Sequence, residues 1–557
     1  MRKLPIGGLE FREIIEGDYL YVDKTPLLND VLWRTPCGVF LFTRPRRFGK
    51  TLTISMMEEF FDIRRKGTTA FDGLEISKPE YSWINKHRNA YNVIRLDLKN
   101  TKGHTMEEFI DGFREALSVC FRKHLDILEN LEMDSVDRAD VNKILNKTAS
   151  NLDVRYSLHL LSELLYDANG LETVILIDEY DAAVSCDMNV DNHDEIIRII
   201  TRMMLAALKG NEYLQFAAVT GTERITGREW LDSLNNITIN HILVEQTNNR
   251  FGFTESEVKA ILDEAGHPEM LPKIREWYGG YDFCGVEMYN PFSVINYVND
   301  GCDEPRPYPM SSSVESMVKE LTLLSNKIEI TAPIKFLQGT PLSGRIDMND
   351  ILGDIDRDLY GIYSILAMNG CLSAHLDDDY RGCELRTPNN EVRATMKKAI
   401  WNANSVDAEL FSRLCDAVGN NKPEAISGVL EQIILNSITC EGFRLGHVMT
   451  VIVDGVSKYC DMRMDDIRYD TTIIVLQAKD ERYPSLIFDL EGSYEQCKLP
   501  EVAEHAMRQI HEKRCYADMT GNVLLIGLSY CKGACHLRSE IINMERDWEK
   551  LRPASDD

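Results

Sequence analysis

The chain has 557 residues, 44% of them hydrophobic and 27% charged, which is enough for about three globular domains. This composition excludes a disordered or fibrous chain, and no apolar run approaches the ~20 residues that span a bilayer. The N-terminus lacks the hydrophobic stretch of a secretory signal, and the fourteen cysteines follow no disulfide pattern. We therefore expect a cytoplasmic protein with reduced thiols and no membrane association.

The chain is strongly acidic. It carries 62 basic and 89 acidic residues, for a net charge of −27. Such a polyanion repels nucleic acid unless basic side chains are concentrated on a local surface. The strongest basic cluster is Arg44, Arg46 and Arg47 beside Lys50. The acid excess also suits a protein partner, so charge alone leaves the type of partner open.

Short apolar runs alternate with helical patterns over residues 1–250. The runs at 39–42, 93–97, 174–177 and 216–219 are typical of strands buried on both faces of a sheet. Residues 51–61 and 196–208 instead repeat apolar side chains at helical spacing. This alternation predicts an α/β fold with a parallel sheet flanked by helices.

The pattern changes after residue 250. Thr254 and Glu257 have the spacing of a helix capping box, and residues 251–425 read as a helical middle or lid region. Residues 426–545 become α/β again. There we expect helices at 424–437 and 500–513 and strands at 446–453, 462–468, 472–479 and 522–528. The sequence thus predicts three domains: 1–250, 251–425 and 426–545.

The run 43–51 lies between a predicted strand and a predicted helix and ends in Gly49, Lys50 and Thr51. This is the layout of a phosphate-binding loop, in which amide groups at the helix N-terminus face phosphate oxygens. Lys50 would reach the β- and γ-phosphates of ATP, and the Thr51 hydroxyl would ligate Mg²⁺. Arg44 occupies the position of the first glycine in the general pattern, so a basic turn that merely ends in Gly-Lys-Thr is the alternative.

Neighbouring residues of this loop are further candidates for nucleotide contact. We place Arg46, Arg47 and Phe48 with Gly49 in the predicted nucleotide site. At least one of the loop arginines, Arg44 included, is expected to contact a phosphate, either in its own subunit or as an arginine finger across a homo-oligomer interface. A solvated turn is the alternative for the arginines.

A second motif supports nucleotide binding. The apolar run 174–177 ends in Asp178 and Glu179, as in a Walker B strand. Asp178 would hold Mg²⁺, and Glu179 would polarise the attacking water. The later run 216–219 leads to Thr220 and Arg224, which are candidates for sensing the γ-phosphate. An ordinary polar strand end is as good an interpretation for those two residues.

These stretches resemble the prokaryotic AAA-ATPase-like family, which joins a P-loop ATPase domain to a C-terminal PD-(D/E)XK nuclease-like domain. The matching segments are 4–7, 21–25, 44–51, 176–181, 233–236, 277–281 and 289–291. The octamer Arg-Pro-Arg-Arg-Phe-Gly-Lys-Thr at 44–51 is highly specific to the family, and it explains Arg44 as the family's own form of the loop. The resemblance implies ATP and Mg²⁺ as ligands and a restriction-endonuclease-like α/β fold at the C-terminus.

The resemblance also implies a site in the C-terminal domain, where two acids would bind Mg²⁺ and a lysine would activate water. Asp465 fits the family's Gly-Arg-x-Asp motif, and Lys479 fits the lysine of its acid-x-Lys motif. Gln477 stands where that motif has its acid, so it offers Mg²⁺ an oxygen without charge. A nuclease-like fold with a decayed site is the alternative.

Two functions follow. The first is an ATPase whose nucleotide state controls a C-terminal nuclease that acts on foreign or mobile DNA. The second is an ATP-dependent sensor or switch whose degenerate C-terminal domain binds DNA, RNA or a protein without cutting. Asp465 and Lys479 favour the first function, whereas Gln477 and the net charge of −27 favour the second.

Overall fold

A computed structural model describes residues 2–33, 38–101, 103, 105–183, 193–223, 234–308, 332–346, 359–377, 382–403, 408–436, 438–439, 442–443, 445–463, 473–493, 495–531 and 534–551. The chain forms two compact units. Unit 1 comprises Met1–Met317 and Pro341–Ala394, and unit 2 comprises Val318–Thr340 and Thr395–Asp557. Each unit is described by itself.

Unit 1 is built on a five-stranded sheet in the order β2–β3–β4–β1–β5, with every neighbouring pair parallel. The strands are β1 (Val39–Thr43), β2 (Asn92–Asp97), β3 (Thr173–Asp178), β4 (Leu214–Gly221) and β5 (Ile237–Asn240). Every residue of β1 and β3 is buried, which is why these strands read as continuous apolar runs. The predicted parallel α/β fold with flanking helices is confirmed, and this sheet is consistent with a P-loop NTPase fold.

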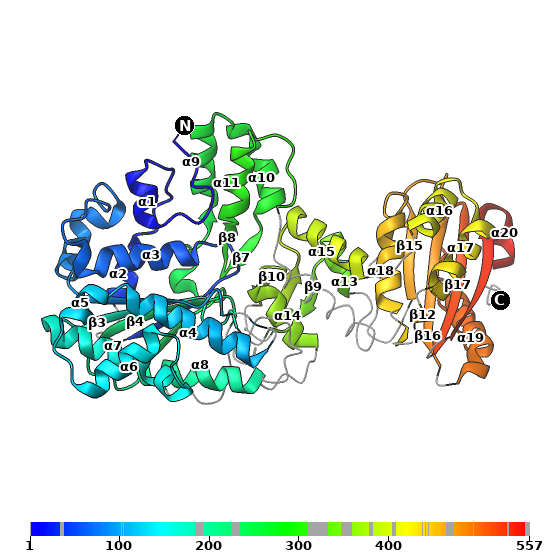
Figure 1. Cartoon of the computed structure of the whole chain (residues 1–557). Coiled ribbons are helices and arrows are strands. Elements are labelled where there is room, and N and C mark those ends of the chain that lie inside the picture. The colour runs from blue at the N-terminus through cyan, green and yellow to red at the C-terminus, as the bar shows by residue number, and fades with distance from the viewer. Residues whose placement is uncertain are drawn as a thin grey trace. The chain divides into compact units, whose positions relative to one another are not determined.

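Helices cover both faces of this sheet (Figure 1). One face carries α1 (Phe11–Glu16), α2 (Pro26–Leu32), α3 (Lys50–Phe61) and the short 3-10 helices Ile63–Arg65, Glu75–Ser77 and Pro79–His87. The other side carries α4 (Met106–Arg122), α5 (Leu125–Asn130), α6 (Ser135–Leu145), α7 (Asn151–Asn169) and α8 (His193–Leu208). The helices predicted at 51–61 and 196–208 are α3 and α8.

The rest of unit 1 mixes helices with two small antiparallel sheets. The helices are α9 (Glu255–Ala265), α10 (Leu271–Tyr278), α11 (Pro291–Asn299), α14 (Leu359–Met368) and the start of α15 (Asn390–Ala403), with 3-10 turns at Glu245–Thr247 and Pro268–Met270. The sheets are β6 (Phe253–Thr254), β8 (Val286–Tyr289) and β7 (Tyr281–Phe283), and β10 (Ser373–Leu376), β11 (Cys383–Arg386) and β9 (Leu342–Gly344). Thr254 and Glu257 form the predicted capping box of α9. The helical prediction for 251–425 did not include the two sheets.

Unit 2 has a five-stranded mixed sheet in the order β14–β15–β16–β17–β18, in which only β16 and β17 are parallel. Its strands are β14 (Cys460–Arg463), β15 (Ile473–Ala478), β16 (Ser485–Gly492), β17 (Asn522–Cys531) and β18 (Ala534–Asn543), beside the pair β12 (Ile438–Thr439) and β13 (Gly442–Phe443). Its helices are α13 (Ala332–Gln338), α16 (Ala408–Gly419), α17 (Pro423–Asn436), α18 (Leu445–Val456), α19 (Leu499–Lys513) and α20 (Met544–Leu551), with a 3-10 turn at Gln496–Lys498.

One strand prediction in unit 2 is wrong. Residues 446–453, expected as a strand, lie within helix α18. Residues 448–453 are all buried, so this stretch of the helix is covered on every side, and a continuous apolar run of that kind cannot be told from a buried strand by its pattern. Strands β16 and β18 were not predicted. The three-domain boundaries remain predictions.

Candidate nucleotide site

The carboxyl ends of the central strands bring the predicted nucleotide residues to one edge of the sheet. Strand β4 lies between β1 and β3, with Thr43 opposite Gly221 and Phe42 opposite Thr220. Helix α3 begins at Lys50, directly after the loop that follows β1. Gly49 precedes the helix with φ +88°, a left-handed conformation that glycine adopts without strain. The N-terminus of α3 therefore lies at the carboxyl ends of the strands.

Lys50 is almost fully buried, and its side chain turns back over the loop. Its Nζ donates hydrogen bonds to the carbonyl oxygens of Arg44 (3.0 Å) and Pro45 (3.2 Å) and to Thr222 Oγ1 (3.3 Å). Glu179 Oε1 lies 3.8 Å from the same nitrogen. The ammonium group therefore sits among neutral oxygens with one carboxylate nearby, where a phosphate could take the place of the weaker contacts.

The two predicted Mg²⁺ ligands lie close to each other. Asp178 is 1% exposed and accepts a hydrogen bond from the Thr220 hydroxyl, and the Thr51 hydroxyl lies near enough to affect its pKa. Burial raises its pKa, the negative charges of Glu179 and Asp97 raise it further, and the two hydroxyl contacts oppose that rise. A cation would relieve this concentration of negative charge, so the donor set fits Mg²⁺. Asp97, opposite Asp178 at the end of β2, was missed by the sequence analysis because the run 93–97 was read only as a strand.

Glu179 follows β3 and lines the same pocket as Lys50. Its backbone has φ +52°, an uncommon conformation for a residue with a side chain. Such strain persists where the surrounding structure holds it, and it is most frequent at functional sites. In this conformation the Glu179 side chain is 22% exposed, whereas the neighbouring Asp178 is buried. This suits a residue that must meet a water molecule.

The loop arginines differ in where they point. Arg44 is fully buried, and its guanidinium donates to the carbonyl oxygens of Thr43, Asn240 and Thr247 and to Thr247 Oγ1. It lies over the rings of Phe251 and Phe283 rather than in the pocket. Its role is structural, which corrects its candidacy for phosphate contact.

Arg46 and Arg47 remain candidates. Arg46 is half-buried, and its Nε has no hydrogen-bond partner within the described part of the chain. Arg47 lines the pocket with φ +70°, and its guanidinium carbon lies 4.0 Å from the centre of the Phe292 ring. Burial lowers the pKa of Arg47, and the charge of Glu391 opposes that shift. Phe48 packs against Tyr281 and Phe283, so it anchors the loop to the small sheet β6–β8–β7.

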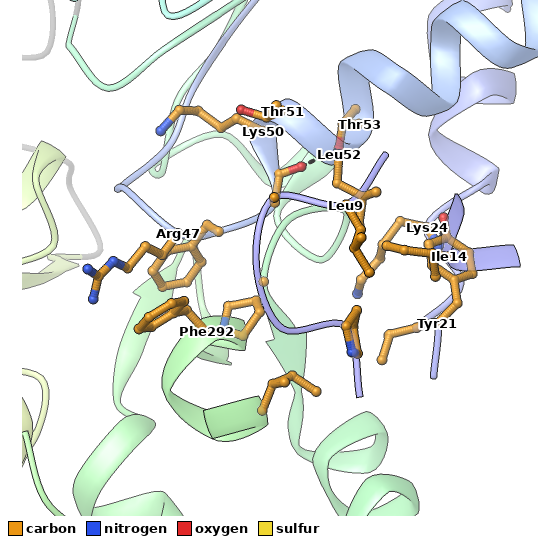
Figure 2. Close-up of a pocket in the computed structure, with 18 of the residues that line it drawn as sticks. Leu9, Ile14, Tyr21, Lys24, Arg47, Lys50, Thr51, Leu52, Thr53 and Phe292 are labelled. Carbon is orange, nitrogen blue, oxygen red and sulfur yellow. Dashed lines mark hydrogen bonds between the residues drawn. The ribbon is translucent and has the colours of Figure 1, made fainter. Parts of the chain in front are cut away.

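The pocket has a volume of about 310 Å³. Figure 2 shows Lys50 and Thr51 at the start of α3, Arg47 against Phe292, and Leu9 and Tyr21 across the pocket. One side is formed by residues 47–53 and Glu179, and the other by the segments 5–10, 20–24 and 291–296. A pocket with one polar and one apolar end suits a nucleoside triphosphate, because the phosphates are charged and the base is largely apolar.

Residues after β3 and β4 form a buried acidic pair that the sequence analysis also missed. Asp181 Oδ2 accepts the backbone N–H groups of Thr222 (2.9 Å) and Glu223 (2.7 Å). Burial raises the pKa of Asp181 to about 6 and that of Glu223 to about 7. Thr220 bonds Asp178 and Thr222 bonds Lys50, so both hydroxyls contact nucleotide-site residues. Arg224, the other sensor candidate, lies outside the described residues.

In unit 2 the structure describes two of the three predicted nuclease residues and places both near Asp461 on β14. Gln477 on β15 pairs with Asp461 on β14. Lys479 Nζ donates to the carbonyl oxygen of Ser457 (2.7 Å) and lies 3.2 Å from Asp461 Oδ1. Asp465 lies outside the described residues. The described contacts of Lys479 are thus with the outer strand and the turn before it.

A second acidic cluster in unit 2 was not predicted. Asp489 is buried on β16, and Glu491 follows on the same face of the strand. Glu491 pairs with His505 Nδ1 (2.8 Å) and accepts from Gln509 Nε2 (3.0 Å) on α19. The signal was the Asp-x-Glu spacing at the end of the apolar run 486–488. Among the described residues, no group of three or more His, Cys, Asp or Glu side chains is arranged to hold a metal ion.

Comparison with known proteins assigns the N-terminal part of the chain. Residues 5–229 match a family model described as a predicted AAA-ATPase. The N-terminal part of the chain is therefore similar to an AAA-ATPase domain. That match supports ATP binding and hydrolysis by unit 1, and ATPases of this type generally use Mg²⁺. It ends at residue 229, so the nuclease-like assignment of 426–545 stays a prediction.

Two individual proteins are also similar to this chain. An uncharacterized protein in the vnfD 5′ region of Azotobacter chroococcum mcd 1 is 26% identical over 410 residues, which cover 72% of this chain and 70% of that protein. The structure of the Aeropyrum pernix ORC2 protein in ADPNP–ADP complexes aligns with a TM-score of 0.32 and 12% identity, over 70% of this chain and 97% of that one. In the described part of the chain, no helix has the length and apolar character needed to cross a membrane.

Proposed function

We propose that unit 1 binds ATP at the pocket beside α3 and hydrolyses it. The observation that supports this proposal is the meeting of Lys50, Thr51, Asp178 and Glu179 at one edge of the sheet, where Thr51 lies near Asp178 and Lys50 lies beside Glu179. These residues come from two motifs more than 120 positions apart in the sequence. Each has a chemical counterpart in Mg-ATP.

The roles follow from the contacts. The N–H groups at the start of α3 would bind phosphate oxygens, and Lys50 would exchange its contacts with carbonyl oxygens for the β- and γ-phosphates. Thr51 and Asp178 would hold Mg²⁺, which supplies positive charge against the phosphates. Glu179 would orient the attacking water and accept its proton. Arg46 and Arg47 are the proposed arginine contacts, within one subunit or across a homo-oligomer.

The apolar end of the pocket suits the nucleoside. Leu9, Tyr21 and Phe292 line it, away from Lys50 and Thr51 (Figure 2). A purine ring buried there would gain apolar contact, as ligands in such pockets typically do. Arg47 lies over the ring of Phe292, so a residue of the polar end contacts a residue of the apolar end at this pair.

Calorimetric titration with Mg-ATP, together with phosphate release, tests the ATPase proposal. Lys50→Ala should abolish binding or hydrolysis, because it removes the ammonium group that bonds the carbonyl oxygens of Arg44 and Pro45 beside the pocket. Glu179→Gln should keep binding while hydrolysis falls about 10²-fold. Glu172→Gln is the matched control, because Glu172 is an exposed acid just before the other end of β3. Equal ATP affinity in wild type and Lys50→Ala would refute the site.

We further propose that the nucleotide state of unit 1 controls a nuclease-like module in unit 2. Asp465, Gln477 and Lys479 are its proposed metal-binding and catalytic residues, and foreign or mobile DNA is the proposed substrate. The mixed sheet with α18 before it and α19 between β16 and β17 supports a nuclease-like fold. The contacts of Lys479 with Ser457 and Asp461 instead favour the second candidate, a module that binds DNA, RNA or protein without cutting.

A metal-dependent nicking assay on plasmid and single-stranded DNA, with and without ATP, separates the two candidates. If the site is a working variant, Gln477→Glu should preserve or raise cleavage, and Asp465→Ala should eliminate it. If the domain only binds, Gln477→Glu should leave cleavage absent. Gln432→Glu, on the exposed side of α17, controls for added negative charge.

A further inference from the structure

A turn far from the phosphate loop in sequence contacts the surroundings of Lys50. Asn369 follows α14, is 6% exposed, and donates from Nδ2 to Glu223 Oε1 (2.7 Å) and to the carbonyl oxygen of Ile365 (3.0 Å). Gly370 has φ +77°, and a Cβ built on it would lie 3.0 Å from Pro45 Cβ. The turn Asn369–Gly370 therefore contacts both the phosphate loop and the loop after β4.

Those two loops supply the oxygens that hold Lys50. Its Nζ donates to the carbonyl oxygens of Arg44 and Pro45 in the phosphate loop and to Thr222 Oγ1 after β4. The turn packs on Pro45 and bonds Glu223, the residue next to Thr222. The turn thus supports the carbonyl oxygen of Pro45 and Thr222 Oγ1, which are two of the three hydrogen-bond acceptors of Lys50.

The loop after β4 is fixed on its other side by residues that follow the Walker B strand. Asp181 accepts the N–H groups of Thr222 and Glu223, and the Tyr180 hydroxyl donates to the carbonyl oxygen of Glu223. Gly221 leaves no room for movement toward Tyr180, since a Cβ there would lie 2.6 Å from that ring. The backbone is held by residues 180–181, while the Glu223 side chain is held by Asn369.

We propose that Asn369 and Glu223 are a pair of positioning residues for ATP hydrolysis. Their hydrogen bond fixes the loop that presents Thr222 to Lys50 and that directly follows the end of β4, where Thr220 bonds Asp178. The inference rests on the proposed ATPase function and deepens it, because it assigns a part in hydrolysis to the segment 359–394, beyond the family match at 5–229.

The physical basis is the sensitivity of catalysis to small displacements. A misplacement of about 1 Å in a reacting or orienting group can cost as much as 10²-fold in rate, although it hardly alters ground-state binding. Glu223 is 3% exposed, so loss of Asn369 would leave a buried carboxyl without that donor and favour a shift of the loop. The phosphate contacts expected from the start of α3 do not depend on this loop, so ATP affinity should change little.

The test uses the full chain with four variants: Asn369→Ala, Glu223→Ala, the double variant, and Glu223→Gln, which keeps an oxygen acceptor for Asn369. Asn211→Ala is the matched control. Asn211 is also a buried amide, it donates to the carbonyl oxygen of Ala207, and it lies at the amino end of β4, away from the pocket. The measurements are kcat, the Kd of Mg-ATP by calorimetry, and the melting temperature.

Asn369→Ala and Glu223→Ala should each lower kcat about tenfold with Kd within about threefold, and the double variant should fall no further. Glu223→Gln should recover most of the activity, and Asn211→Ala should keep the wild-type kcat. If Asn369→Ala does not fold, Asn369→Ser, which is smaller but polar, should show the same loss.

Three results would overturn the inference: an unchanged kcat in the single variants, losses that multiply in the double variant, or an equal loss in Asn211→Ala. The proposed function fails separately, because in that case the wild type itself would not hydrolyse ATP. A wild type that hydrolyses ATP, loses this activity on Lys50→Ala and is unaffected by Asn369→Ala would reject the positioning pair alone.

Discussion

Arg44 stabilises unit 1 instead of binding the nucleotide, and Arg44→Ala tests that assignment. The substitution removes four hydrogen bonds and leaves their buried acceptors in Thr43, Asn240 and Thr247 without this donor. Each lost hydrogen bond costs about 1 kcal/mol. Loss of the contacts with the rings of Phe251 and Phe283 adds roughly 1 kcal/mol. Burial lowers the pKa of Arg44 to about 9, so removal of the buried charge offsets part of this cost.

The expected net loss is about 3 kcal/mol in the free energy of unfolding. For a unit of roughly 370 residues this corresponds to a fall of about 4 °C in melting temperature, which differential scanning calorimetry resolves. Below the transition, ATP affinity should stay within about threefold of wild type. Arg47→Ala is the matched control, since Arg47 is half-buried in the pocket; it should weaken ATP binding and lower the melting temperature by less than about 1 °C. An Arg44→Ala protein that melts like wild type but has lost ATP binding would refute the assignment.

Three further predictions concern the two sites. Glu179→Gln should trap bound Mg-ATP, so filter-retained nucleotide should persist while phosphate release falls about 10²-fold; normal release would remove Glu179 from the base role. Burial raises the pKa of Glu223 from 4.5 to about 7, so the fold favours its neutral form, and the resulting stabilisation is lost as pH rises from about 4.5 through 7. Glu223→Gln should therefore flatten the fall in the free energy of unfolding between about pH 4.5 and 7, which amounts to a few kcal/mol, and an unchanged pH profile would contradict this. At the unit 2 site, any cleavage by the wild type should require millimolar Mg²⁺ or Mn²⁺, because Gln477 brings no charge; strong cleavage at micromolar Mg²⁺ would contradict this reasoning.

The N-terminal sheet and its phosphate loop could be predicted because their signals are local. Buried strands leave continuous apolar runs, and the turn before α3 requires Gly49 at a left-handed position. Such patterns fix each element and its end, and the parallel topology then gathers the ends at one edge. Lys50, Thr51, Asp178 and Glu179 could be grouped in this way from the amino-acid sequence alone.

The parts that could not be predicted depend on contacts between distant segments. Nothing in the local pattern of Asn369 indicates that its side chain bonds Glu223, 146 positions earlier. The direction of the Arg44 side chain could not be predicted either. A basic residue in a phosphate loop suggests a phosphate contact, whereas three of its four hydrogen bonds go to Asn240 and Thr247, about 200 positions later. Helix α18 was misread for another reason, since β-branched residues in a buried helix resemble a strand over short windows.

Arg44 and Arg47 lie in the same loop but have different environments: Arg44 stabilises the loop, and Arg47 lines the pocket. Arg44 uses its fixed fork to bond carbonyl oxygens on three segments, which holds the loop against β5 and the turn at 245–247 and leaves its backbone oxygen for Lys50. Arg47, three residues later, has a left-handed backbone that turns its side chain out over Phe292. A glycine in place of Arg44 would remove these hydrogen bonds. The loop therefore depends on a buried cation for rigidity at the position where the general pattern has a glycine, and its pocket-lining cations, Lys50 and Arg47, remain available for phosphate.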